Sequence, residues 1–260
     1  MPRALLAVVA LAFATPPGRP APLPGATEVR GVVFHDRNGN GVRDAGEPGV
    51  PGAVVSDQVT AVRAAADGSW SMSADGPGHL VFVSVPDGWR PVGPFWRSIQ
   101  PGAGAMDFPL VPTRRGRELT FVHASDTHIA PATVPRMERL RALVDSLHPD
   151  FVIITGDLVR DALRVGEAEA TGYYELFNAQ AALVRQPLWT VPGNHENFGI
   201  ERDKSKVSVD HPLYGRTMYR HYRGPDYYSF NAGGIHFVGL NSVDYDDTRY
   251  YGHVDSLQLA

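Results

Sequence analysis

Two patterns of hydrophobic and polar positions divide the chain. From Thr27 to about Val111, short β-prone runs alternate with clusters of Gly, Pro and Asp, which is typical of a small β-sandwich. The expected strands there are Glu28–Phe34, Ala53–Ser56, Ser69–Ser73, Leu80–Val85 and Met106–Leu110. After Arg117, apolar strands alternate with amphipathic helices instead. We therefore expect a β-sandwich module at 27–111, a linker at 112–117 and a second domain at 118–260.

The second domain is expected to contain three strands and two helices in alternation. The strands are Leu119–Ala124, Phe151–Thr155 and Leu188–Val191. The first helix, ending near Pro149, should bury Met137, Leu140, Leu143, Val144 and Leu147, and the second Tyr173, Leu176, Phe177, Leu183 and Val184. This order predicts a parallel sheet covered by helices.

Two further segments follow the third strand. The runs Tyr227–Asn231 and Ile235–Leu240, separated by Ala-Gly-Gly, predict a β-hairpin, and Val254–Leu259 reads as the opening turns of a helix. Before the hairpin lies an aromatic and basic stretch, namely Tyr214, Arg216, Tyr219, Arg220, His221, Tyr222 and Arg223. This stretch is either a loop that grips an anionic substrate or a solvated connection whose tyrosines pack against the domain.

The N-terminus has the three parts of a secretory signal. Met1–Arg3 carries a positive charge, Ala4–Ala14 is apolar, and the run ends in an Ala-x-Ala site. We expect a signal peptide at 1–14, a Pro-rich linker at 15–26 and export to the periplasm or the extracellular space. The apolar run is too short to span a bilayer. No other stretch predicts a transmembrane segment.

Composition narrows the classes of function. The 260 residues are 43% hydrophobic and 20% charged, as in folded globular proteins. The absence of cysteine excludes disulfides, thiolate metal sites and a cysteine nucleophile. A net charge of −4 without a basic stripe argues against nucleic acid as the main partner. The sequence does not predict an oligomeric state.

One loop of the first module has the spacing of a calcium loop. Between Asp36 and Glu47 the chain fits D-x-[DN]-x-[DN]-G-x5-E, which places oxygen ligands at Asp36, Asn38, Asn40, Asp44 and Glu47. The flanking segments are strands rather than the two helices of an EF-hand. The same residues could instead form a turn that satisfies its own backbone through Asx bonds. A structural calcium ion and a metal-free turn therefore both remain open.

Polar residues follow all three predicted strands of the second domain. The first strand ends in Asp126 and His128, the second in Gly156-Asp157, and the third in Gly193-Asn194-His195-Glu196. Ligands of parallel α/β sheets bind at the carboxyl ends of the strands. Carboxylate and imidazole groups suit Mn, Fe or Zn. A single Asp after a strand is usually a helix cap, but three such loops at one edge predict a metal site.

These three loops resemble the first three motifs of the calcineurin-like metallophosphoesterase family. The resemblance implies an N-terminal β-sandwich followed by an α/β/α phosphoesterase domain that binds two metal ions (Mn, Fe or Zn). It implies that Asp126 and His128 hold the first ion, that Asp157 bridges both and that Asn194 holds the second. His195 would act beside the phosphate as proton donor or charge stabiliser. Glu196 would support these ligands without touching a metal.

The implied function is a secreted hydrolase of small phosphomonoesters or phosphodiesters, acting by attack of a metal-bound hydroxide. The family pattern also has a later His and a Gly-His-x-His motif, for which this chain offers only Gly252-His253-Val254-Asp255. We therefore expect an incomplete phosphoesterase domain, truncated at its C-terminus. Four other histidines could replace the absent ligands: His211, His221, His236 and His253. The alternative function is a calcium-stabilised binding module that carries a non-catalytic phosphoesterase-like domain.

Overall fold

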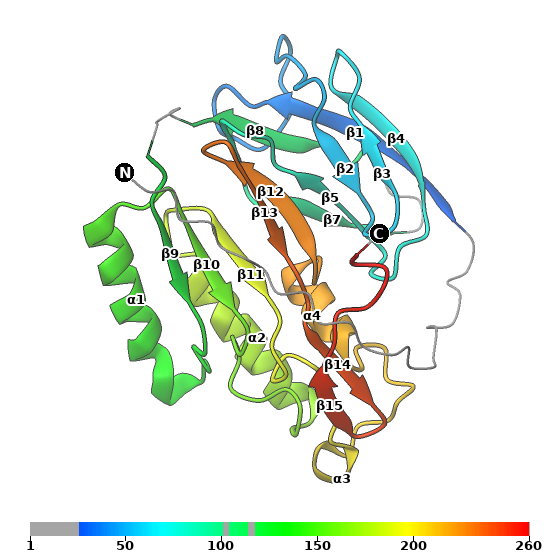
Figure 1. Ribbon diagram of the computed structural model, residues 1–260, viewed down its shortest axis with the longest axis vertical. Coiled ribbons are helices and arrows are strands. Elements are labelled where there is room, and N and C mark those ends of the chain that lie inside the picture. Colours follow the sequence, from blue (N-terminus) through cyan, green and yellow to red (C-terminus); the bar gives the residue numbers. More distant parts are fainter. Residues whose placement is uncertain (1–25, 101–103, 114–117, 260) are drawn as a thin grey trace, which may run out of the picture.

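The computed structural model describes residues 26–100, 104–113 and 118–259. The predicted signal peptide, nearly all of the Pro-rich linker and most of the linker at 112–117 lie outside the described residues. The chain forms a β-sandwich module and an α/β module, which lie against each other (Figure 1). The expected architecture, a β-sandwich followed by an α/β domain, is confirmed.

The first module consists of two four-stranded sheets. One has the order β4–β1–β8–β6, with bounds Ser69–Ala74, Thr27–His35, Phe108–Pro112 and Trp89–Pro91. The other has the order β3–β2–β5–β7, with bounds Ala61–Arg63, Val54–Ser56, Leu80–Ser84 and Trp96–Ser98. Strands β3, β6 and β7 were not expected from the sequence. Strand β4 alternates strictly between exposed and buried positions, so one face of it packs into the sandwich.

The second module is built on a parallel sheet in the order β11–β10–β9. Its strands are Leu188–Val191, Phe151–Thr155 and Phe121–Ala124, close to the expected ranges. Helices α1 (Val134–Leu147) and α2 (Glu167–Ala181) connect them. Val152 and Ile154 of β10 pack toward the two helices, whereas Phe151 contacts aromatic side chains on the opposite face. All three strands therefore end at one edge of the sheet.

The buried faces of both helices differ in part from the expectation. On α1, Met137 and Val144 are buried, but Leu143 and Leu147 are about half exposed. The stripe at three- and four-residue spacing is thus wider than the surface that the sheet covers.

On α2, the buried positions are Ala170, Tyr174, Phe177 and Ala181. The buried face of α2 therefore differs from the expected one at the start of the helix, where Tyr174 rather than Tyr173 is buried. Leu183 is exposed, because the helix has already ended at Ala181.

The segment after β11 contains two short helices and two hairpins. Helices α3 and α4 span Arg202–Ser205 and Arg216–Arg223. The predicted hairpin is confirmed as β12 (Tyr228–Ala232) and β13 (Ile235–Gly239), and a second hairpin, β14–β15, spans Val243–Asp246 and Arg249–Gly252. At the C-terminal end, Asp255 accepts hydrogen bonds from the backbone of Leu257 and Gln258, the bonding of a helix cap, although residues 256–259 form turns.

Helix α4 corrects both interpretations of the basic and aromatic stretch. It is neither a loop nor a solvated connection, because Met218 and Tyr219 are buried. Arg220 pairs with buried Asp226, and Arg223 donates to Asn178, so both guanidinium groups hold the fold together instead of gripping a substrate. Only the expected packing of tyrosines against the domain is confirmed. The prediction failed because the two buried positions lie among charged and polar ones.

The two modules share one hydrophobic core and a buried polar contact. Trp189 and Phe230 of the α/β module lie in the same buried cluster as the inner residues of the sandwich. Gln58 of the sandwich donates to the carboxylate of Asp226 at 3.1 Å, and Arg220 donates to the Pro77 carbonyl at 3.1 Å. We call this contact, made by Gln58, Pro77, Arg220 and Asp226, the seam. It binds the sandwich to helix α4.

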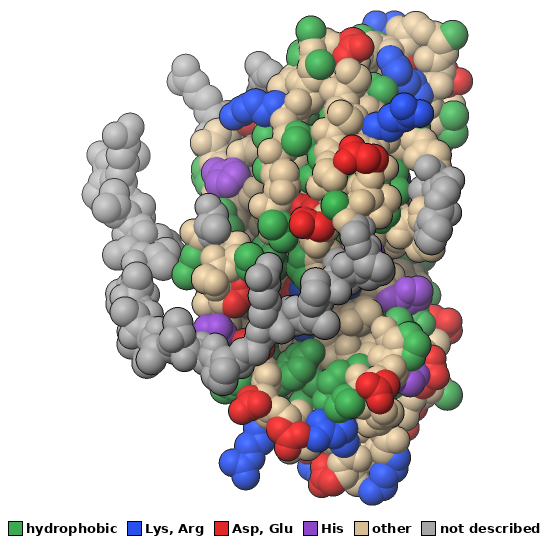
Figure 2. Space-filling view, turned by 90° about the vertical axis from the view of Figure 1, so that its right-hand side faces the viewer, with side chains coloured by type: hydrophobic (Ala, Val, Ile, Leu, Met, Phe, Trp, Pro, Cys, Tyr) green, Lys and Arg blue, Asp and Glu red, His purple; other side chains and the backbone are tan. Residues whose placement is uncertain are grey.

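On the face shown in Figure 2, acidic and basic side chains are interspersed over both halves of the molecule. Within the described ranges, none of the helices has the length and apolar character needed to cross a bilayer.

Candidate metal centre

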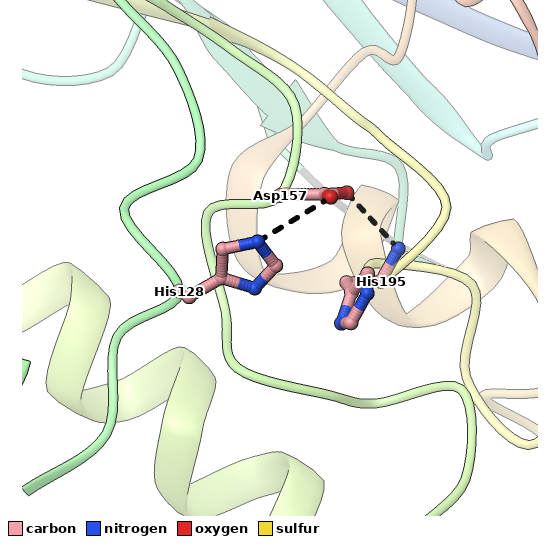
Figure 3. A group of neighbouring side chains, drawn as sticks. All are labelled: His128, Asp157 and His195. Atoms are coloured by element: carbon pink, nitrogen blue, oxygen red, sulfur yellow. Dashed lines mark hydrogen bonds and ion pairs between the residues drawn. The ribbon is translucent and has the colours of Figure 1, made fainter.

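Three polar side chains meet at the carboxyl edge of the parallel sheet. His128 follows β9, Asp157 follows β10 and His195 follows β11, and one potential ligand atom from each lies within 4.8 Å of the others. The His128 ring faces the Asp157 carboxylate, and His195 reaches this carboxylate through its backbone nitrogen (Figure 3). His128 Nε2 is 3.6 Å from an Asp157 carboxylate oxygen and 3.6 Å from one of Asp126. The predicted convergence of the three loops is therefore present in the structure.

Backbone hydrogen bonds between the loops hold these side chains together. Asp126 N–H donates to the Gly156 carbonyl at 3.1 Å, and His128 N–H donates to the Asp157 carbonyl at 2.9 Å. His195 N–H reaches the Asp157 carboxylate at 3.3 Å. Asp126, His128 and Asp157 have φ values of 57°, 41° and 51°, in the left-handed region that side chains rarely adopt. Such conformations concentrate at functional sites, where the surrounding structure enforces them.

Gly193 is required by close packing. A Cβ atom at this position would lie 2.2 Å from an Asp157 carboxylate oxygen and 2.6 Å from its backbone nitrogen. The third loop can therefore approach Asp157 only with glycine at 193. The Gly-Asn-His-Glu sequence thus begins with the residue that brings His195 beside Asp157.

Glu196 fixes the second and third loops to each other. Its carboxylate is fully buried and accepts backbone N–H bonds from Asp157 at 2.9 Å, Val159 at 3.0 Å and Gly193 at 2.6 Å. Burial raises the pKa of Glu196 to about 7, although the N–H bonds from Val159 and Gly193 oppose the shift. Glu196 contacts the backbone of a predicted ligand, as a supporting residue would.

The backbone carbonyl of Arg160 lies close to Nδ1 of both histidines. It is 2.5 Å from Nδ1 of His195 and 3.5 Å from Nδ1 of His128. The two rings are perpendicular, with centroids 4.6 Å apart. This carbonyl was not identified from the sequence, because a backbone group leaves no residue-type signal.

The remaining predicted residues occupy different positions. Asp126 is 64% exposed and joins the group only through His128. Asn194 directly precedes His195, and its backbone carbonyl accepts from Asn197. Four histidines lie outside the group and have partners elsewhere: His211 with Glu167, His221 against the Tyr222 ring, His236 with Asn231, and His253 with Asp244. In the structure as described, none of these four replaces a ligand at the edge of the sheet.

The predicted calcium loop forms a compact turn of hydrogen bonds in the sandwich. Buried Asp36 accepts from the backbone of Gly39, Asn40 and Gly41, and Glu47 accepts from that of Arg37 and Asp44. The amides of Asn38 and Asn40 donate to the Asp44 carboxylate. These bonds match the expected metal-free turn, in which side chains satisfy the backbone of the loop. The carboxylates of Asp36, Asp44 and Glu47 nevertheless remain clustered. Calcium binding stays a prediction.

The donor set at the edge of the sheet fits a first-row transition metal. The His128 imidazole and the Asp157 carboxylate are ligands typical of Mn, Fe or Zn, Asp126 adds a second carboxylate beside His128, and the His195 imidazole lies next to them. The group is half-buried, so an ion could enter from solvent and keep open positions for a ligand. The residues thus fit a catalytic rather than a closed structural metal site.

Comparison with known proteins agrees with this geometry. The calcineurin-like phosphoesterase family model matches residues 119–258, more than half of the chain, and the match includes all three loops. A search of curated proteins found no matching relative. The chain belongs to the calcineurin-like phosphoesterase family.

Proposed function

We propose that this protein hydrolyses small phosphate esters, with metal ions bound at the carboxyl edge of β9–β11. The observation that carries the proposal is the convergence of His128, Asp157 and His195 from three separate loops, within a domain of a metal-dependent family. When bound, Mn, Fe or Zn would supply Lewis acidity and a nucleophile at neutral pH. Two ions, with Asp126 and His128 on one, Asn194 on the other and Asp157 shared, are part of the proposal.

The side chains at this edge have different proposed roles. Asp157 and His128 would bind a metal ion at the edge of the sheet, and Glu196 holds the loop of Asp157 against that of His195. When its imidazole is protonated on both nitrogens, His195 gives the Nε2 proton to the leaving oxygen of the ester. An imidazolium in this position lowers the cost of expelling an alkoxide.

Monoesters and diesters remain equal candidates for the substrate. Arg220 and Arg223 belong to the stretch that could have gripped an anionic substrate, and both are used inside the fold. Export, which rests on residues 1–14, also stays a prediction.

The test is hydrolysis of p-nitrophenyl phosphate and bis(p-nitrophenyl) phosphate by the full chain. The protein is first freed of metal and then supplied with Mn²⁺, Fe²⁺ or Zn²⁺ separately. We expect turnover that requires an added metal, and the preferred ester decides between the two classes. If neither ester is hydrolysed with any of the three metals, the non-catalytic alternative is favoured, namely a β-module with an inactive phosphoesterase-like domain.

A further inference from the structure

One backbone carbonyl lies close to Nδ1 of both histidines at the candidate metal centre. The Arg160 oxygen is 2.5 Å from His195 Nδ1 and 3.5 Å from His128 Nδ1. A carbonyl oxygen accepts hydrogen bonds and cannot donate one, so a neutral imidazole that bonds to it must carry its proton on Nδ1. Nε2 of the same ring is then free of a proton.

The Arg160 carbonyl is itself fixed between the first and third loops. Arg160 N–H donates to the Ile129 carbonyl at 3.1 Å, directly after His128. Ala162 N–H donates to the backbone carbonyl of His195 at 2.9 Å. The segment 160–162 therefore bonds to the backbone beside both histidines, as well as to the His195 ring.

An ionic contact secures this segment from outside the site. Arg164 pairs with Asp161 at 3.2 Å and with Glu201 at 2.8 Å. Its backbone N–H also donates to Asp161, at 3.1 Å. The Arg164 side chain is 31% exposed and that of Glu201 16%, so these pairs are partly shielded from solvent. They connect the segment that carries the Arg160 carbonyl to the start of α3.

We propose that the Arg160 carbonyl holds His195 in the Nδ1–H form, and that Arg164 acts as a positioning residue by fixing this carbonyl through Asp161 and Glu201. His195 then presents Nε2 to the edge of the sheet. In functional histidines, the hydrogen bond made by one ring nitrogen commonly decides which of the two nitrogens carries the proton. The consequence for ester cleavage rests on the proposed function, but the proton position does not.

The chain offers a matched control for Arg164. Lys204 also pairs with Glu201, on the other carboxylate oxygen. Its side chain is 53% exposed, and in the described structure it makes no hydrogen bond or ion pair to residues 160–164. Arg164→Met and Lys204→Met each remove one cation from Glu201. Only Arg164→Met removes the contact to Asp161.

The experiment is a long-range proton–nitrogen NMR spectrum of the histidine rings in the ¹⁵N-labelled, metal-free full chain. It is recorded at about pH 8.5, where ordinary imidazoles are neutral. The pattern of couplings to the two ring carbon protons distinguishes the two neutral forms. His195→Gln identifies the His195 signals by their loss.

We expect His195 to be protonated on Nδ1 in the parent chain. Arg164→Met should raise the share of the Nε2–H form several-fold, Arg164→Lys should restore part of the parent pattern, and Lys204→Met should leave it unchanged. A parent spectrum with the proton on Nε2 overturns the role of the carbonyl, whatever the variants do. Equal spectra for Arg164→Met and Lys204→Met overturn the role of Arg164. Because no turnover is measured, these results are independent of whether an ester is hydrolysed.

Discussion

Two fully buried carboxylates, Glu196 at the candidate metal centre and Asp226 at the seam, have opposite pKa shifts. Burial would raise both pKa values. At Glu196 this effect prevails and the pKa rises to about 7, because its partners are backbone N–H groups. At Asp226 burial is outweighed by the guanidinium of Arg220 and by hydrogen bonds from Arg220 and Asn241, and the pKa falls to about 2.

The difference between the two regions lies in what each carboxylate organises. Glu196 holds the backbone of two loops, and the side chains of those loops remain directed at a site that can accept a ligand. The Asp226 carboxylate accepts its hydrogen bonds from protein side chains, namely those of Arg220, Gln58 and Asn241. The seam is therefore specialised for stability. The edge of the sheet carries unusual backbone conformations, as expected of a functional site.

The largest expected effect is on turnover at the candidate metal centre. Asp157→Asn and His195→Ala should each reduce metal-dependent hydrolysis of the preferred model ester by orders of magnitude, since Asp157 is the central carboxylate and His195 the expected proton donor. His236→Ala is the control, because His236 is exposed on β13 and its ring bonds to Asn231, away from the edge of the sheet. Steady-state rates at saturating metal measure the effect.

The two variants should also differ from each other. If His195 donates a proton, His195→Ala lowers turnover and keeps most of the metal affinity, whereas Asp157→Asn lowers both. Turnover close to that of the parent in either variant would contradict the assignment.

The next largest effect should be on stability at the seam. Asp226→Ala leaves the guanidinium of Arg220 buried without its carboxylate, which should lower the free energy of unfolding by about 3–5 kcal/mol. Asp247→Ala removes the solvent-screened ion pair with Arg202 and should cost far less. Urea denaturation of both variants gives the comparison. Equal losses would show that the seam contributes no more than a surface pair.

Acid should remove the contribution of Asp226. Its pKa in the folded protein is about 2, below the value of about 3.9 for an unfolded chain. The stabilisation is therefore complete above about pH 4 and declines as the pH falls toward 2. The difference in unfolding free energy between the parent chain and Asp226→Asn should shrink over this interval. A difference that is constant from pH 5 to pH 2 would contradict the ion pair.

A methyl group at position 193 should perturb the candidate metal centre with a smaller cost in stability. In Gly193→Ala the new Cβ collides with Asp157, which should cost about 1–3 kcal/mol and weaken metal binding. Gly166→Ala is the control, because its Cβ would meet nothing within 4 Å. Thermal melts and metal titrations of both variants are the measurements. Unaltered metal affinity in Gly193→Ala would show that the close approach is not needed.

The smallest effect is expected from calcium at the loop between Asp36 and Glu47. Added calcium should raise the melting temperature of the parent chain by a few degrees, because clustered carboxylates gain a counter-ion in the folded state only. Glu47→Gln should reduce this rise. Calcium bound at the edge of the sheet would act on both proteins equally, so the difference isolates the loop. An identical response in both would favour the metal-free turn.

The sequence predicted the parts of the molecule that local pattern determines. Asp126, Asp157 and His195 could be placed at one edge because each follows an apolar strand and parallel strands end together. The seam could not be predicted, since Gln58 and Asp226 are 168 positions apart and neither belongs to a motif. The role of the Arg160 carbonyl could not be predicted, because it depends on backbone geometry alone. Leu143 was placed wrongly because periodicity does not say how wide a covered face is.

The most direct test of the central claim is a calorimetric titration of Mn²⁺ into the metal-free full chain, beside Asp157→Asn and the control His236→Ala. We predict saturable binding to the parent and to His236→Ala, and at least tenfold weaker binding to Asp157→Asn, because only that variant loses the carboxylate between the two histidines. Equal binding to all three proteins, or no saturable binding to the parent, would contradict a metal centre at the carboxyl edge of β9–β11.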